Sequence, residues 1–336
     1  MFENYLVQSF LLIISLIFIN KICKKNNFLL SFTGNIHQKF ASIENVPLTG
    51  GLLILLNVIF FLSNDFYSIK FFIFSMFFIG FMSDIKKIDS PKIRILIQLI
   101  LILIYLFFDA INLHHTRIEF LDLLLNNYFF SLFFTCFCIL IIINGSNFID
   151  GINVLVIGYY TIICFAILYL VRDGYKLEEL KIITNLLQVL VILFIFNFFN
   201  KLYLGDGGSY LLGFLISVIL ISFYLQNLQL SPFFIILLLW YPAYENLFSI
   251  FRKLLNTKSP LAPDTKHLHQ LILAYLKQKL KKNNSFMNTL CGLMIVIYNG
   301  VVISIAMIDP KKTIFMLILI LINLIVYQSI YYILKK

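Results

Sequence analysis

Charged residues are scarce in this sequence. Asp, Glu, Lys and Arg form 12% of the 336 residues, whereas 61% are hydrophobic and the mean hydropathy is +0.94. A soluble domain usually carries about 25% charged residues. The composition therefore excludes an ordinary soluble globular protein and predicts an integral membrane protein.

Four stretches contain no charged residue at all, namely 123–149, 207–244, 286–308 and 313–334. Each is long enough for the roughly 20 apolar residues that a membrane-spanning helix needs. The first apolar segment of the chain also lacks a basic leading region and a small-residue cleavage site, so we expect it to be retained as a helix.

The five cysteines lack the spacing of a disulfide framework or a metal-binding knot. They are Cys23, Cys136, Cys138, Cys164 and Cys291. The sequence also lacks internal repeats, a low-complexity linker and a separate polar domain. It therefore predicts one membrane domain over residues 1–336.

Hydropathy predicts an all-α, polytopic membrane protein with about eleven transmembrane helices. We expect a kink at Pro242 in the ninth helix, because proline removes one backbone hydrogen bond. The expected helices lie near residues 4–21, 48–64, 66–83, 92–110, 124–143, 152–171, 182–199, 209–225, 231–250, 286–307 and 313–334.

The net charge of +10 is spread over short clusters between the apolar segments. Such a distribution is typical of membrane topology and contact with anionic lipid headgroups, and no nucleic-acid partner is expected. With the N-terminus outside and the C-terminus in the cytoplasm, the inner loops and tail hold 19 of the 26 Lys and Arg residues. Cytoplasmic loops are normally the more basic ones, so this orientation is predicted.

Four polar clusters fall on the predicted cytoplasmic side. They lie at residues 80–94, 144–153, 203–209 and 262–270. Because polar residues are costly within the hydrocarbon unless they face a cavity, their convergence on one side indicates one site. The loops expected to form it are 21–47, 84–94, 144–153, 199–208 and 251–285.

Each cluster also has a purely structural explanation. Asp206 can cap the helix that follows it, and residues 144–153 can form a simple polar turn. Asp84 can form a surface ion pair with a neighbouring lysine, and a His-x-His pair in a loop can be merely solvated. A single site has the advantage of explaining all four clusters together.

The residue types indicate phosphoryl transfer. Carboxylate and amide oxygens suit Mg²⁺, and glycine at a helix start lets a phosphate approach the backbone amides. Lysine and histidine neutralise a diphosphate, and an aromatic such as Tyr203 can stack on a nucleobase. At the inner membrane surface this combination fits transfer from a cytosolic nucleotide to a membrane-borne acceptor.

A transporter or flippase of a lipid-linked or anionic substrate is the main alternative. Broken helices and intramembrane Asp and Asn would suit it. However, the polar clusters here lie at helix ends rather than at the bilayer midplane, and no internal repeat is present. A structural subunit of a membrane complex would leave the four clusters unexplained.

Five motifs give the chain a family resemblance over roughly residues 4–308. It resembles the polyprenyl-phosphate N-acetylaminosugar-1-phosphate transferases, the glycosyltransferase family 4 enzymes that include phospho-MurNAc-pentapeptide translocase and the bacterial GlcNAc-1-phosphate transferases. The motifs are Pro47-Leu-Thr-Gly50-Gly51, Ser83-Asp84 with Ser90-Pro91-Lys92-Ile-Arg94, Asn147-Phe-Ile-Asp150-Gly151-Ile-Asn153, Tyr203-Leu-Gly205-Asp206-Gly-Gly-Ser209 and Pro263-Asp264-Thr-Lys-His267-Leu-His269.

The resemblance implies transfer of an N-acetylaminosugar 1-phosphate from a UDP-sugar to polyprenyl (undecaprenyl) phosphate, with release of UMP. It implies a Mg²⁺ requirement, with Mn²⁺ as a substitute. The reaction would be the first membrane step of surface polysaccharide or cell-envelope glycan synthesis, in the bacterial inner (cytoplasmic) membrane. A monomer and a homodimer both remain open.

Roles follow from the resemblance by position in the motifs. The implied metal ligands are Asp206 and Asn147. The implied catalytic residues are Asp84, Lys87 and Asp150. The implied substrate-binding residues are Asn153, Tyr203, Gly205, His267 and His269.

Three positions depart from the family pattern. Ser83 replaces the first carboxylate of an acidic pair, Asn153 replaces an aspartate, and Gln270 ends the histidine motif. The full acidic pair therefore cannot be essential here. These departures argue against a strict peptidoglycan translocase and favour a surface-polysaccharide initiator that uses a UDP-N-acetylhexosamine or a deoxy relative.

Overall fold

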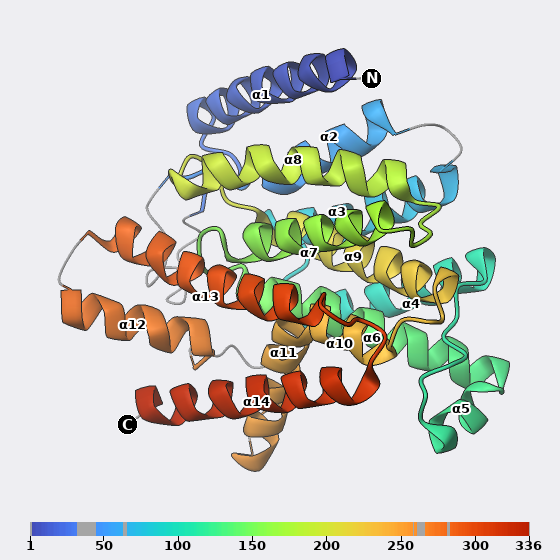
Figure 1. Ribbon diagram of the computed structural model, residues 1–336. Helices are drawn as coiled ribbons and strands as arrows, with labels where there is room; N and C mark the ends of the chain where they lie inside the picture. The colour runs from blue at the N-terminus through green and yellow to red at the C-terminus, as the bar shows by residue number, and fades with distance from the viewer. Residues whose placement is uncertain are drawn as a thin grey trace.

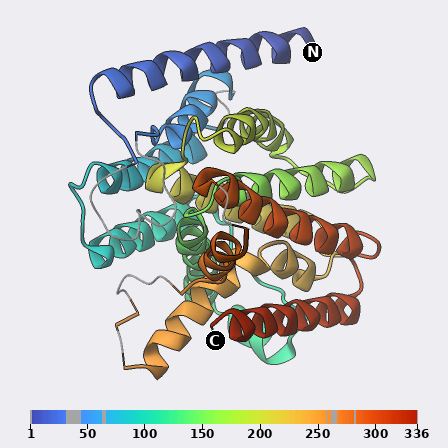
Figure 2. The ribbon, with the colours of Figure 1, turned by 90° about the vertical axis from the view of Figure 1, so that its left-hand side faces the viewer.

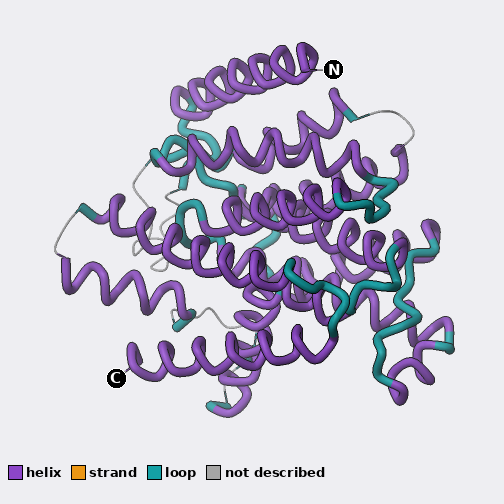
Figure 3. Tube along the Cα trace, viewed as in Figure 1, coloured by secondary structure: helices purple, strands orange, loops and turns teal. Residues whose placement is uncertain are grey.

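A computed structural model describes residues 2–31, 45–62, 66–257, 259–260, 266–280 and 283–335. Within these residues the chain forms fourteen helices joined mostly by short loops (Figure 1, Figure 3). The helices are α1 (Phe2–Lys25), α2 (Gly50–Phe61), α3 (Tyr67–Asp84), α4 (Pro91–Asp109), α5 (Glu119–Leu125), α6 (Tyr128–Ile149), α7 (Leu155–Arg172), α8 (Leu180–Phe198), α9 (Gly205–Gln226), α10 (Pro232–Leu238), α11 (Trp240–Leu255), α12 (Leu268–Leu280), α13 (Asn284–Ala306) and α14 (Thr313–Lys335).

The prediction of an all-α, polytopic membrane protein is confirmed. Nine helices of the described chain are long and apolar enough to cross a membrane, and the pair α10 and α11 forms a tenth if it counts as one bent span. The predicted helix at 48–64 corresponds to α2, which has only 12 residues. At about 1.5 Å per residue, α2 is shorter than the roughly 30 Å hydrocarbon core.

The ninth predicted helix is broken rather than kinked. Helices α10 and α11 meet at 76°, with the break at Leu239 rather than at Pro242. Pro242 has no N–H to donate to the carbonyl of Leu238, one helical turn earlier. The hydroxyl of Tyr159 donates to that carbonyl instead, at 2.9 Å. A tertiary hydrogen bond thus stabilises the break.

Several boundaries differ from the prediction. Helix α6 continues to Ile149, so most of the expected 144–153 loop is helical, and α9 begins at Gly205 rather than at 209. The segment expected to be an open loop over 251–285 contains α12. Its buried residues recur along one face at helical spacing, which explains why it folds against the bundle.

Helix α9 is the central helix. In its most apolar stretch 94% of the residues are buried, against 28% in α1 and 17% in α14, which lie toward opposite edges of the bundle (Figure 1, Figure 2). Its neighbours approach closely at glycines: a Cβ on Gly80 of α3 would lie 2.4 Å from the backbone of Asp206, and one on Gly51 of α2 would lie 2.4 Å from the amide nitrogen of Gly208. Small residues allow such close packing in membranes, and it fixes the N-terminus of α9 against α2 and α3.

Candidate active site

The start of α9 is joined to the segment before α2 by backbone hydrogen bonds. The Tyr203 amide donates to the Pro47 carbonyl at 2.8 Å, and the Gly50 amide donates to the Tyr203 carbonyl at 3.0 Å. The Gly51 amide donates to the Leu204 carbonyl at 3.1 Å. Two of the sequence motifs are therefore interlocked through the main chain.

Asp84, the last residue of α3, caps α9. Its Oδ1 accepts the Asp206 N–H at 2.9 Å and its Oδ2 accepts the Gly207 N–H at 3.1 Å. Gly205 has a φ of +78°, and a Cβ there would lie 2.8 Å from Asp84 Oδ2. A carboxylate at a helix N-terminus satisfies free amides and the helix dipole. Both structural explanations from the sequence were therefore wrong: Asp84 bonds α9 rather than forming a surface ion pair, and Asp84 rather than Asp206 is the cap.

The side chain of Asp206 is held by three donors from three other positions. Its Oδ2 accepts from the Ser83 hydroxyl at 2.6 Å and from Arg94 Nη1 at 2.8 Å, and its Oδ1 accepts from Asn147 Nδ2 at 2.7 Å. Arg94 also donates to the Ser83 hydroxyl at 2.5 Å. The Asp206 side chain is 29% exposed. The Asp206 carboxylate is thus oriented by the protein but accessible.

Arg94 was quoted in the sequence motif but given no role there. It lies in the first turn of α4, where Pro91 begins the helix. Its Nε is buried without a hydrogen-bond partner in the described structure. Only the fold shows that this turn faces Asp206, because α3 and α4 are joined by a tight turn whose direction the residue pattern does not determine.

Asp150 follows α6 directly and adds a third carboxylate. The backbone of Gly205 hydrogen-bonds to it. Burial raises the pKa of the Asp150 carboxyl well above its usual range, and the negative charges of Asp206 and Asp84 raise it further. Three carboxylates from three segments therefore surround the first turn of α9.

A second polar cluster is centred on Glu245 of α11, which is 1% exposed. Its Oε2 lies 2.9 Å from His267 Nδ1, and its Oε1 accepts the Leu268 N–H at 3.0 Å. His269 Nδ1 lies 3.6 Å from Glu245 Oε1, and the two imidazole rings are stacked 5.5 Å apart. Burial lowers the pKa of His269. The sequence reasoning missed Glu245, although an acidic residue directly after a long charge-free stretch is a functional signal.

The end of α6 joins the two clusters. Asn147 bonds Asp206, the neighbouring Phe148 ring lies 5.2 Å from the His267 ring, and a Cβ on Gly151 would lie 3.9 Å from His269 Nε2. The structure thus brings together all four predicted polar clusters as far as they are described. Residues 261–265, which include Pro263 and Asp264 of the fifth motif, lie outside the described residues.

Three further candidates differ in their burial and contacts. The Lys87 side chain is exposed on the turn after α3. Asn153 is buried: its N–H donates to Asn288 Oδ1 at 2.7 Å, and its Nδ2 donates to Thr289 at 3.1 Å and to Asn200. These bonds join the start of α7 to α13, so Asn153 has a structural role here. Tyr203 is half-buried at the rim of the site. The substrate roles of all three stay predictions.

The donor set fits Mg²⁺ bound by few protein ligands. Among the described residues no three His, Cys, Asp or Glu side chains form a ready metal cage. Mg²⁺ commonly takes one or two carboxylates and completes its shell with waters and substrate phosphates. Asp206 offers an accessible carboxylate, and a half-turn of the Asn147 amide would present its oxygen in place of Nδ2.

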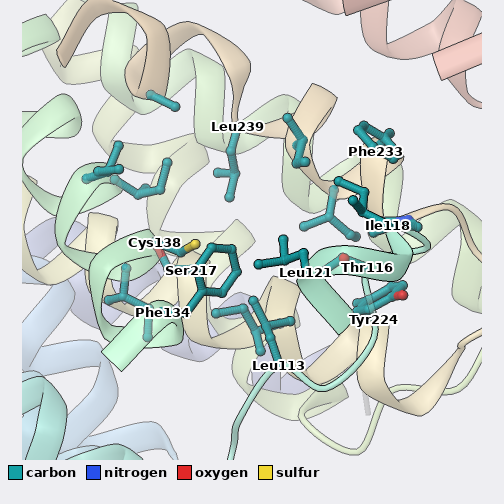
Figure 4. A pocket seen from close by; sticks show the side chains of 18 of the residues that line it. Leu113, Thr116, Ile118, Leu121, Phe134, Cys138, Ser217, Tyr224, Phe233 and Leu239 are labelled. Atoms are coloured by element: carbon teal, nitrogen blue, oxygen red, sulfur yellow. The ribbon is translucent and has the colours of Figure 1, made fainter. Parts of the chain in front are cut away.

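An apolar cavity of about 230 Å³ lies beside the break between α10 and α11 (Figure 4). Its lining includes Leu113 and Leu121, which precede α6, and Ile141 and Leu247 of α6 and α11. Apart from a few side chains such as Ser217, its walls are hydrocarbon. It suits an apolar chain rather than a nucleotide.

Residues 66–224 match the family model described as glycosyl transferase family 4. This part of the chain is similar to that family. The matched segment runs from the start of α3 almost to the end of α9, so it includes Asp84, Asp150 and Asp206 but not the Glu245 cluster.

Curated relatives agree with this assignment. The chain is 30% identical over 136 residues to the probable undecaprenyl-phosphate N-acetylglucosaminyl 1-phosphate transferase of Bacillus subtilis (strain 168), covering 40% of this chain and 38% of the relative. It is 26% identical over 243 residues to the undecaprenyl-phosphate alpha-N-acetylglucosaminyl 1-phosphate transferase of Salmonella typhi, covering 68% of this chain and 65% of the relative. The chain thus spans less than two thirds of the length of these relatives.

Proposed function

We propose that the protein transfers an N-acetylaminosugar 1-phosphate from a UDP-sugar to undecaprenyl phosphate and releases UMP. The observation that carries this proposal is the meeting of Asp84, Asp150, Asp206 and Arg94 with the two histidines at one end of a membrane helix bundle. The names of the relatives support the donor and acceptor classes.

In the proposed reaction an oxygen of undecaprenyl phosphate attacks the β-phosphorus of the UDP-sugar. A new P–O bond forms, the bond from that phosphorus to the bridging oxygen breaks, and UMP leaves with the electron pair. In this reaction Arg94 would neutralise negative charge that develops on the phosphate. The two histidines, near the Asp150-Gly151 turn, would act on the same diphosphate. Positioning and charge neutralisation are the main contributions a protein makes to such a transfer.

Mg²⁺ is the proposed cofactor, with Mn²⁺ as a substitute. Asp206 and Asn147 would hold it, and a bound divalent ion would neutralise the diphosphate and polarise its oxygens. Asp84 then acts mainly by fixing the first turn of α9, and Asp206 with it. Lys87, Asn153, Tyr203 and Gly205 are proposed to border the nucleotide.

The proposed topology keeps eleven crossings, with α2 as a short span and α10–α11 as a bent one. The N-terminus would lie outside and the C-terminus in the cytoplasm, so that the site faces the cytosolic nucleotide in the bacterial inner membrane. The apolar cavity between α6, α9 and α10–α11 would accept part of the polyprenyl chain. Residues 1–336 would act as one unit in surface-polysaccharide initiation.

A transporter or flippase is the less favoured function. Its substrate site would be expected near the bilayer midplane between repeats, whereas the polar residues here lie at helix ends. The family match also favours a transferase.

The test is to incubate membranes that contain the protein with sugar-labelled UDP-N-acetylhexosamines, undecaprenyl phosphate and Mg²⁺. We expect labelled lipid and UMP in equal amounts. Label transport into vesicles without UMP release would overturn the proposal in favour of the transporter.

A further inference from the structure

Glu245 is a buried acid with three polar neighbours and no role in the family motifs. It is 1% exposed, and a carboxylate removed from water is costly unless it is hydrogen-bonded or paired. Its two oxygens are shared between His267 Nδ1 at 2.9 Å, the Leu268 N–H at 3.0 Å and the Tyr241 hydroxyl at 3.4 Å. The acid therefore bonds the histidine segment both through a side chain and through the main chain.

The main-chain bond places the histidines. Leu268 is the first residue of α12, a helix of 13 residues, and a carboxylate that accepts an N–H at that point acts as a helix cap. Because His267 precedes and His269 follows Leu268, this bond sets the position of both rings relative to α11. The rings are parallel within 12°.

The side-chain bond sets the protonation pattern of His267. A carboxylate can only accept, so Nδ1 of His267 must carry a proton, and Nε2 is left as an acceptor in the neutral ring or as a second donor in the cation. His269 Nδ1 is 3.6 Å from the same carboxylate, which is too long for a hydrogen bond, and neither of its ring nitrogens has a hydrogen-bond partner in the described structure. A Cβ on Gly151 would lie 3.9 Å from His269 Nε2, so this nitrogen lies beside the Asp150-Gly151 turn.

We propose that Glu245 is a positioning residue for the transfer reaction, which fixes the ring orientation and the Nδ1–H form of His267 and places His269 beside the Asp150-Gly151 turn. The proposal rests on the proposed function, because it assigns the histidines to the same site. Glu245 would act through the histidines without touching the substrate. Hydrogen-bond partners that orient metal-ligating histidines typically change activity by about 10–100-fold when they are substituted, and we expect a comparable effect here.

The first variant is Glu245→Gln. The amide keeps an oxygen for the Leu268 N–H but presents an NH₂ group to His267 Nδ1, which then has to become an acceptor. The expected result is a fall in turnover of about tenfold or more with unfolding temperature in detergent little changed. Glu179→Gln is the matched control: Glu179 also accepts side-chain hydrogen bonds, from Ser222 and Gln226, but lies at the other end of α9. It should keep wild-type turnover.

A double-mutant cycle separates positioning from a general structural effect. In the background of His267→Ala, Glu245→Gln should reduce turnover by a several-fold smaller factor than it does in the wild type. The reason is that the effects of substituting two residues that act through one another do not add. An equal fold-loss in both backgrounds would overturn the proposal. So would a large loss of thermal stability in Glu245→Gln accompanied by an additive loss of activity.

A second readout does not depend on activity. The chain has five histidines, so ¹⁵N spectra of histidine-labelled protein can be assigned with His267→Ala. We expect Nδ1 of His267 to be protonated in the wild type and unprotonated in Glu245→Gln. An unprotonated Nδ1 in the wild type would contradict the proposed role of Glu245. If the wild type makes no lipid-linked sugar, the proposed function fails, while the spectra still decide whether Glu245 holds His267.

Discussion

The backbone N–H of Asp206 donates to the carboxylate of Asp84 at 2.9 Å. One acidic residue thereby fixes the main chain of another, and the two do not stand side by side as equivalent ligands. Asp84 has both oxygens occupied by backbone amides, whereas the Asp206 side chain is directed toward Ser83, Arg94 and Asn147. This division of roles makes the two carboxylates experimentally separable.

Asp84→Asn should reduce both stability and activity. It would place an NH₂ group against one of the two α9 amides and remove the negative charge from the helix start. Loss of a cap costs about 0.5–2 kcal/mol. The measurement is the unfolding temperature of the purified variant in detergent, with Asp109→Asn as the control, since Asp109 accepts a hydrogen bond from Ser68 on an exposed part of the bundle. Equal unfolding temperatures for the two variants would remove the capping role.

Asp206→Asn should abolish Mg²⁺-dependent transfer while the protein still inserts and folds. An asparagine keeps the size and one acceptor oxygen, but the metal loses a charged ligand that contributes several kcal/mol, at roughly tenfold per 1.4 kcal/mol. The measurement is steady-state transfer at low Mg²⁺. More than about a tenth of wild-type activity would show that Asp206 is not the essential metal ligand.

Ser83→Ala should be costly here, although Ser83 stands where the family pattern has a carboxylate. The Ser83 hydroxyl donates to Asp206 and accepts from Arg94. A hydrogen bond to a charged group contributes about 1.5–3 kcal/mol, so we expect a loss of about tenfold in turnover, smaller than that of Asp206→Asn. Full activity of Ser83→Ala would mean that Arg94 and Asn147 suffice to orient Asp206.

Asp150→Asn should change how stability depends on pH. The folded state raises the pKa of the Asp150 carboxyl through burial and through the charges of Asp206 and Asp84. Folding therefore favours the protonated form, and wild-type stability should fall as the pH rises through that raised pKa. The asparagine cannot ionise, so the variant should be the more thermostable at neutral pH, and its advantage should shrink toward acidic pH. An advantage that is constant with pH would contradict a raised pKa.

Topology can be checked with reporter fusions. Fusions after Lys25, Pro91, Lys201 and Lys282 should report the cytoplasm, because the inner loops hold most of the basic residues. Fusions near His115, Lys176 and Pro310 should report the outside. A single one of the first four outside would break the topology, since the polar clusters could not then meet on the cytoplasmic side.

The sequence predicts the helices and the polar clusters well because both depend on local composition. Runs of apolar residues without charge specify spans, and the clusters stand out against them. The break at Leu239 was not predictable from Pro242 alone, because the Tyr159 hydroxyl that stabilises it comes from a different helix. Helix α12 was not predicted because it lies in a polar, basic segment. Its buried face is defined by packing against α13 and α14.

The sequence selects several side chains that the structure brings together, but it does not predict the hydrogen bonds between them. Asp206, Asn147 and Asp84 were selected, yet their hydrogen bonds depend on the close glycine contacts of α9 with α2 and α3. Arg94 and Glu245 received no role, because their partners are far along the chain. The hydrogen bonds of Asn153 to Asn288 and Thr289 were likewise not predictable, because both partners lie far along the chain.

Transfer of the sugar 1-phosphate to undecaprenyl phosphate can be tested directly with two differently labelled donors. UDP-N-acetylglucosamine that carries ³²P in the β-phosphate and the same compound with ³²P in the α-phosphate are incubated separately with undecaprenyl phosphate, Mg²⁺ and membranes that contain wild-type protein or Asp206→Asn. We expect β-label in the lipid and α-label in UMP, with neither product in the Asp206→Asn membranes. Recovery of either label in UDP, or β-label in lipid at the wild-type rate in Asp206→Asn, would contradict the proposed transfer.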